Sequence, residues 1–218
     1  MIISLTGFMG CGKSSVGREL SRLLCCPFVD LDSVIEERAG RSIPEIFASD
    51  GEAVFRRLEA EALGNIVAQP VNSVGPHLRF AQAPPSRGWQ NANSVHQADA
   101  PLPHLRQSAL SHDGHYEAVV LALGGGTVMT RECAEMVREK TMCVYLRATV
   151  ETLVRNLDGE NENRPMLSNE EPLNVRVAHL MALRSGTYER TAHMVIDTDG
   201  KSIADIAMEI HRNLNKIS

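Results

Sequence analysis

The sequence predicts an α/β fold in which helices cover both faces of a parallel β-sheet. Two observations indicate this class: short apolar segments recur along the chain, and segments with a helical period separate them. Strands joined by helical crossovers lie parallel, and strands that are apolar on both faces are typical of a sheet covered on both sides. The length of 218 residues suits a single domain over residues 1–218.

Each predicted strand is a short apolar run, and each predicted helix has an apolar face with a period near 3.6 residues. The predicted strands cover residues 2–6, 28–29, 119–123, 142–146 and 194–197. The predicted helices cover residues 13–24, 32–39, 51–67, 130–140, 149–157, 173–191 and 202–214. Ser42 and Glu45 have the spacing of a capping box, which predicts one further short helix that ends at Ala48.

The pattern is interrupted over residues 69–116. This stretch holds six of the ten prolines and five of the eight histidines but no lysine, and it shows neither a helical nor a strand period. We interpret it as an irregular or disordered surface insertion in the domain. Residues 158–172 are polar as well, and we expect them to form a mobile lid.

Charge and composition argue against several classes of partner. The net charge is −5, from 22 basic and 27 acidic residues, whereas nucleic-acid binding needs a basic face. No apolar run approaches the ~20 residues that cross a bilayer, and the first strand starts too early for a signal peptide to precede it. The five scattered cysteines suggest reduced thiols. We expect a cytoplasmic monomer that binds neither nucleic acid nor membranes.

The strongest motif is the segment GFMGCGKS, from Gly7 to Ser14, which matches the phosphate-loop pattern G-x-x-x-x-G-K-S. It lies between a predicted strand and a predicted helix, where inward backbone N–H groups and the helix N-terminus favour an anion. Lys13 is expected to bridge the β- and γ-phosphates, and the Ser14 hydroxyl to bind Mg²⁺. The motif predicts binding of ATP with Mg²⁺; the alternative is a glycine-rich turn with an incidental lysine. The residues expected to contact the nucleotide here are Gly10, Cys11, Gly12, Lys13, Ser14 and Ser15.

Two aspartates, Asp30 and Asp32, follow the second predicted strand. In an extended segment, side chains two residues apart point the same way, so both carboxylates would face the crevice at the carboxyl end of the sheet. One would then hold Mg²⁺ through water, and the other would accept a proton from an attacking hydroxyl. The alternative is a helix N-cap, a role that the position of Asp32 also fits.

Arg56 and Glu59 lie three residues apart on a predicted amphipathic helix and therefore share a face. They form either a surface ion pair or an arginine that a glutamate orients toward an anionic substrate. Residues 124–126 are three glycines directly after a predicted strand. They form either a flexible turn or a place where a ligand approaches the backbone closely, because glycine lacks a Cβ atom.

Two more arginines are candidates for contacts with an anion. Arg164 precedes a proline inside the predicted lid, where it is either a solvated loop residue or a group that neutralises charge on a transferring phosphoryl. Arg184 lies on a predicted helix, with Tyr188 one turn later, and an ordinary surface position is the alternative.

Together these segments resemble the shikimate kinase family. The family pattern has the same six elements in the same order: a phosphate loop, D-x-D, F-R-x-x-E, G-G-G, R-P, and R followed by Y. The resemblance covers about residues 1–68 and 117–214. It implies a three-layer P-loop kinase fold like that of the nucleoside monophosphate kinases, with five parallel strands in the order 2-3-1-4-5. It also implies the reaction of ATP with shikimate to give ADP and shikimate 3-phosphate, a step of aromatic amino-acid biosynthesis.

The resemblance further implies a role for each candidate residue. Asp30 would help to place Mg²⁺, Asp32 would bind the 3-hydroxyl of shikimate and take its proton, and Glu59 would orient an arginine. The other implied contacts are the shikimate carboxylate for Arg56 and Arg184, the substrate ring for Gly125 and Gly126, the γ-phosphate for Arg164 and the adenine for Arg155. The implied catalytic residues are Lys13, Asp32 and Arg164.

One departure from the family pattern lies on the acceptor side. Gly186 stands where the family usually has proline, which predicts a looser helix around Arg184. The predicted insertion also joins two segments that border the implied substrate site. Two other functions stay open at this point: another small-molecule kinase of the same fold, acting on gluconate or a nucleotide, and a non-catalytic ATP-binding interaction module.

Overall fold

The computed structural model describes residues 1–68, 118–158 and 172–217. Its five strands form one sheet in the order β2-β3-β1-β4-β5, and all neighbouring pairs are parallel, which confirms the predicted fold. The predicted insertion, and the predicted lid apart from its two end residues, lie outside the described residues. The strands are β1 (Ile2–Thr6), β2 (Phe28–Asp30), β3 (Val119–Ala122), β4 (Met142–Arg147) and β5 (Met194–Asp197).

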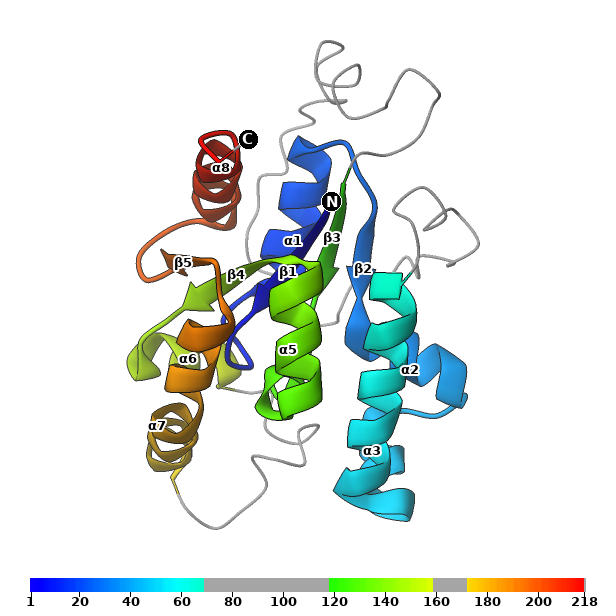
Figure 1. The fold of residues 1–218 in the computed structure, drawn as a ribbon. Coiled ribbons are helices and arrows are strands. Elements are labelled where there is room, and N and C mark those ends of the chain that lie inside the picture. The colour runs from blue at the N-terminus through cyan, green and yellow to red at the C-terminus, as the bar shows by residue number, and fades with distance from the viewer. Residues whose placement is uncertain (69–117, 159–171, 218) are drawn as a thin grey trace, which may run out of the picture.

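Helices flank the sheet on both sides (Figure 1). Helices α1 and α8 pack against each other, whereas α5 packs against β4, α3 and α7. In the described ranges, no helix is long and apolar enough to cross a bilayer. The helices are α1 (Lys13–Leu23), α2 (Leu31–Ala39), α3 (Ile43–Ala68), the 3₁₀ helix η2 (Thr127–Met129), α5 (Arg131–Lys140), α6 (Val150–Leu157), α7 (Leu173–Thr191) and α8 (Ile203–Leu214).

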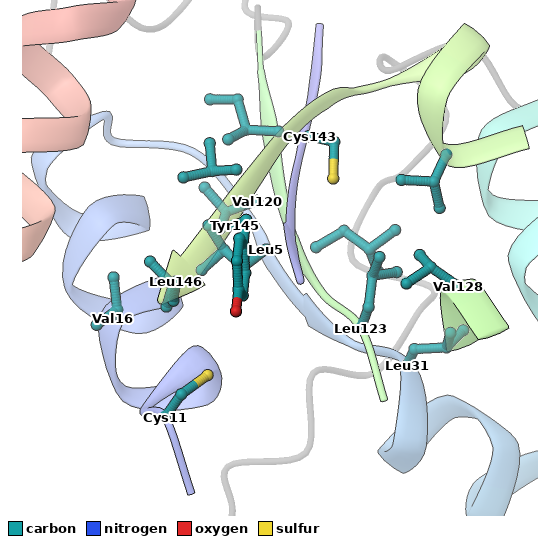
Figure 2. Packing of buried hydrophobic residues seen from close by; sticks show 14 of the residues in the cluster. Leu5, Cys11, Val16, Leu31, Val120, Leu123, Val128, Cys143, Tyr145 and Leu146 are labelled. Atoms are coloured by element: carbon teal, nitrogen blue, oxygen red, sulfur yellow. The ribbon is translucent and has the colours of Figure 1, made fainter. Parts of the chain in front are cut away.

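Strand β1 lies at the centre of the sheet, and all five of its residues are buried. Its Ile3 lies opposite Val120 of β3 and Met142 of β4. Apolar side chains from these strands and the surrounding helices form the core (Figure 2). Gly17 lets α1 approach the sheet closely, since a Cβ there would lie 2.4 Å from the ring of Phe28. Close packing of α1 fixes its N-terminus beside the carboxyl end of β1.

The turn from β2 into α2 differs from the prediction. Leu31 is the first residue of α2, so Asp32 lies in the first helical turn and not in an extended segment. The N-cap is Asp30, whose Oδ1 accepts a hydrogen bond from the backbone N–H of Asp32 at 3.2 Å. The alternative N-cap role for Asp32 is therefore wrong, because the helix starts one residue earlier than the apolar pattern indicates.

The two helical segments predicted between residues 42 and 67 are joined in α3. The predicted capping box is present: the Ser42 N–H donates to the Glu45 carboxylate at 2.7 Å, and the Glu45 N–H donates to Ser42 Oγ at 3.4 Å. The boundary predicted between the two segments corresponds to a kink at Gly51, where φ is 79° and ψ is 174°. Glycine reaches these angles without strain, which allows the chain to change direction before the segment that carries Arg56.

Candidate active site

The phosphate loop connects β1 to α1 and is tightly folded. A Cβ atom on Gly7 would lie 2.7 Å from the carbonyl oxygen of Leu146, and one on Gly10 would lie 2.9 Å from the side chain of Leu157. Gly10 and Gly12 have φ values of 80° and 90°, which other residues rarely adopt. The loop ends at the N-terminus of α1, where free N–H groups and the helix dipole favour a phosphate.

Lys13 points into the phosphate loop. Its Nζ donates to the carbonyl oxygens of Gly7 at 3.0 Å and Phe8 at 2.9 Å. Neutral carbonyls are weaker partners for an ammonium group than phosphate oxygens, since hydrogen bonds between two ionised groups are the stronger ones. The lysine is therefore placed to exchange these carbonyls for a nucleotide phosphate.

Ser14 and Asp30 form the pair that sequence reasoning assigned to a metal. The Ser14 hydroxyl donates to Asp30 Oδ2 at 2.7 Å, so both groups face the same point beside the phosphate loop. Within the part of the chain that the structure describes, no cluster of three or more His, Cys, Asp or Glu side chains is arranged to hold a metal ion. A hydroxyl beside one carboxylate suits Mg²⁺, which keeps most of its ligands as water and phosphate oxygens.

A cleft of about 700 Å³ opens at the carboxyl end of the sheet. It brings together the phosphate loop, both aspartates, Gly125 and Arg155 of α6, as sequence reasoning expected. The sequence analysis did not predict that the β5–α8 connection forms one wall of the cleft. The available signal was the rule that ligands of parallel sheets bind beside the carboxyl ends of the strands, which points to the residues after β5. The lining residues are 9–16, Asp30, Asp32, Leu123, Gly125, Thr152, Arg155, Asn156, Thr198, 200–203 and Ile206.

Asp32 has the most perturbed carboxylate in this cleft. Burial, followed by the charge of Asp30, raises its pKa to about 6, while Lys13 opposes the rise. The charges of Glu59 and Glu36 add to it. A carboxylate with a pKa near neutrality can take a proton from a hydroxyl more readily than an ordinary aspartate can.

Arg56 and Glu59 form a partly buried pair, so the surface ion-pair alternative is wrong. Arg56 Nη1 donates to Glu59 Oε2 at 2.8 Å, and only 1% of the Glu59 side chain is exposed. The glycines after β3 make room for these groups: a Cβ on Gly126 would lie 2.6 Å from the Arg56 guanidinium, and one on Gly124 would lie 2.8 Å from Asp32 Oδ1. Side chains of the protein itself, Arg56 and Asp32, therefore approach the backbone of residues 124–126 closely.

Arg184 is not a surface residue either, because it is only 8% exposed. Its guanidinium lies over the ring of Phe8 in the phosphate loop, 5.9 Å from the ring centre. Tyr188, one turn later, donates its hydroxyl to the Gly125 carbonyl at 2.5 Å and stacks on Tyr145. Helix α7 thus contacts both the phosphate loop and the glycine segment. It runs unbroken through Gly186, so the predicted loosening is not visible in its backbone.

The remaining candidates are placed only in part. Arg155 lies at the cleft, 3.4 Å from the hydroxyl of Thr152, and Arg56 and Arg184 are not among the residues that line the cleft. Arg164 lies outside the described residues. The contacts that link α7 to the phosphate loop involve Phe8, which sequence reasoning did not single out; its position inside the phosphate-loop motif was the available signal.

The chain matches the family model of shikimate kinase over residues 9–76 and 105–215. The chain belongs to the shikimate kinase family. A shikimate kinase of Thermus thermophilus is 33% identical over 212 residues, which cover 97% of this chain and 89% of that relative. The shikimate kinase of Bordetella pertussis is 32% identical over 208 residues, covering 95% of this chain and 75% of that relative.

Solved structures of shikimate kinases have the same fold. The enzyme of Acinetobacter baumannii, in complex with shikimate, has a TM-score of 0.75 and 26% identity, covering 100% of this chain and 94% of that one. The enzyme of Aquifex aeolicus has a TM-score of 0.67 and 26% identity, covering 99% and 96%. Residues 77–104, between the two parts of the family match, fall inside the predicted insertion. The predicted family and the predicted fold are both confirmed.

Proposed function

We infer that this protein transfers the γ-phosphoryl group of ATP to the 3-hydroxyl of shikimate, giving ADP and shikimate 3-phosphate. The observation that carries this inference is the position of Asp32 in the same cleft as the phosphate loop, with a pKa raised to about 6. A hydroxyl acceptor needs such a group beside the phosphoryl donor. Membership of the shikimate kinase family supports shikimate as the acceptor.

The donor half of the reaction relies on the phosphate loop. Its backbone N–H groups and the N-terminus of α1 hold the phosphates. The ammonium group of Lys13 turns from the backbone carbonyls to the β- and γ-phosphate oxygens. Ser14 and Asp30 would hold Mg²⁺, which when bound supplies charge neutralisation on the same oxygens. Arg155, which also lines the cleft, is the residue that we propose to contact the adenine. We retain Arg164 as the lid arginine that approaches the γ-phosphate.

The acceptor half relies on Asp32 and two arginines. Asp32 accepts the proton of the 3-hydroxyl while the oxygen forms a bond to the γ-phosphorus and the bond to the ADP oxygen breaks. Arg56 and Arg184 supply guanidinium groups that bind the carboxylate of shikimate. The planar guanidinium matches the geometry of a carboxylate, so that two parallel hydrogen bonds can form. Positioning and charge neutralisation are the main contributions that a phosphoryl transfer needs.

A coupled assay of ADP release tests this function. Shikimate, gluconate and nucleoside monophosphates are offered in turn with ATP and Mg²⁺, and we expect turnover with shikimate alone. Turnover with gluconate or a nucleotide in place of shikimate would show a different kinase. Failure of all three acceptors, with ATP binding intact, would favour the non-catalytic module.

We also propose that the enzyme works as a cytoplasmic monomer. All five cysteines are free thiols, which fits a reducing compartment. Light scattering on a size-exclusion column tests the monomer, and a mass near twice 23.9 kDa would contradict it.

A further inference from the structure

Thr127 is a buried polar residue that the function described above does not use. It directly follows the three glycines and begins η2, and it has no exposed surface. Its hydroxyl donates to Glu59 Oε1 at 2.6 Å, a contact between residues 68 positions apart in the sequence. The contact joins the glycine segment after β3 to the helix that carries Arg56.

Glu59 is fixed at both of its carboxylate oxygens. Oε1 accepts from Thr127, and Oε2 accepts from Arg56 Nη1 at 2.8 Å. A buried carboxylate that loses one hydrogen bond is left with an unsatisfied oxygen. The carboxylate can then rotate at a lower cost in free energy, because only one of its oxygens is still held. The threonine hydroxyl therefore determines the orientation in which Glu59 meets the arginine.

Arg56 has one fixed side and one exchangeable side. Its Nη1 is held by Glu59, whereas Nε and Nη2 donate to Glu52, whose side chain is 56% exposed. An exposed ion pair contributes little free energy, so a ligand carboxylate can replace Glu52 there. The orientation of that ligand-facing edge depends on the fixed side.

We propose that Thr127 is a positioning residue for the carboxylate of the acceptor. Its hydroxyl holds Glu59, and Glu59 holds the guanidinium plane of Arg56 so that the Nε and Nη2 edge faces the acceptor. Thr127 does not touch the reacting atoms, and its effect passes through Glu59. The inference rests on the proposed function, because it names the part of the protein that sets recognition of that acceptor.

Thr127→Val tests the proposal, because valine keeps the shape of threonine and removes the hydroxyl. We expect the KM for shikimate to rise about tenfold, the usual size of losing a hydrogen bond to a charged group. The KM for ATP should stay within about twofold, and kcat within about threefold, because Thr127 does not reach the nucleotide cleft. Thr127→Ser keeps the hydroxyl and should restore most of the affinity for shikimate.

Thr141→Val is the matched control. Thr141 is also buried; its hydroxyl donates to the carbonyl of Val137 at 2.6 Å and lies 2.6 Å from the hydroxyl of Ser4, and neither partner is a residue of the proposed acceptor site. We expect this variant to be less stable than the wild type with both KM values unchanged. If Thr127→Val behaves in the same way, Thr127 is only structural and the proposal is overturned. Equal increases in both KM values would overturn it as well.

Two further measurements separate the possible failures. If Thr127→Val does not fold, Thr127→Ala is measured against the same criteria, since it removes the hydroxyl without adding volume. If the wild type does not turn over shikimate, the proposed function fails. If the wild type is active and the variants keep its KM for shikimate, only the role of Thr127 fails.

Discussion

Replacing Asp32 with asparagine should make the ligand-free protein more stable while it removes activity. Burial raises the pKa of Asp32 from 3.8 to about 6, and the nearby charges of Asp30 and Glu59 contribute. The folded protein therefore binds a proton at Asp32 more tightly than the unfolded chain does. Ionised Asp32 destabilises the fold, and Asp32→Asn keeps the shape of the side chain without the charge.

The magnitude and the pH window follow from the two pKa values. A shift of about two units corresponds to roughly 3 kcal/mol, and partial solvent exposure of Asp32 reduces our expectation to about 1–2 kcal/mol. Because the folded state holds the proton more tightly, the contribution of Asp32 to stability falls as the pH rises from about 4 to about 6. Above that pH the contribution is constant. The variant should thus exceed the wild type by the full amount at pH 8 and by little near pH 4.

Urea unfolding of both proteins, in EDTA and without nucleotide, at several pH values from 4 to 8 measures this difference. In the difference between the two unfolding free energies, the contributions of titratable groups that both proteins share cancel. The same variant should lose about 10²-fold or more in kcat, the usual contribution of a general base. A stability difference that does not change with pH would refute the electrostatic reasoning. A kcat within threefold of the wild type would refute the role of Asp32 as the base.

Two other substitutions test the acceptor side. Tyr188→Phe removes the hydroxyl that donates to the Gly125 carbonyl, and we expect a loss of about 1–2 kcal/mol in urea unfolding; an unchanged unfolding free energy would contradict the importance of this bond. Glu52→Gln removes the exposed carboxylate from the Nε and Nη2 edge of Arg56, and we expect the KM for shikimate to fall about two- to threefold at an unchanged KM for ATP. A rise in that KM would show that Glu52 helps to bind the acceptor.

The sheet and the phosphate loop could be predicted from the sequence because local patterns determine them. The run of apolar residues in β1 and the motif that ends at Ser14 each lie within a few consecutive positions. The strand order came only from the resemblance to a family, since apolar periodicity carries no information on which strands are neighbours. The pattern also placed both aspartates in the cleft, although Leu31 starts a helix and the extended geometry assumed for them is absent.

The contacts of the acceptor side could not be predicted in this way. The bond of Thr127 to Glu59 and that of Tyr188 to Gly125 join residues more than 60 positions apart, and no local pattern in the sequence indicates which partner either hydroxyl binds. The burial of Arg184 depends on the packing of α7 against the phosphate loop, which becomes visible only when the helices are placed.

The charges of the site are the reason why we expect activity and stability of the free protein to oppose each other at Asp32. Asp30, Asp32 and Glu59 lie close enough for the two other carboxylates to raise the pKa of Asp32. Lys13 lowers that pKa but donates its hydrogen bonds to backbone carbonyls. Glu59 is paired with Arg56, whereas the charge of Lys13 offsets only part of the repulsion between Asp30 and Asp32, and bound Mg²⁺ would offset more of it. Binding of Mg²⁺ and ATP should therefore stabilise the wild type more than Asp32→Asn, because part of that stabilisation is relief of repulsion that the variant no longer contains.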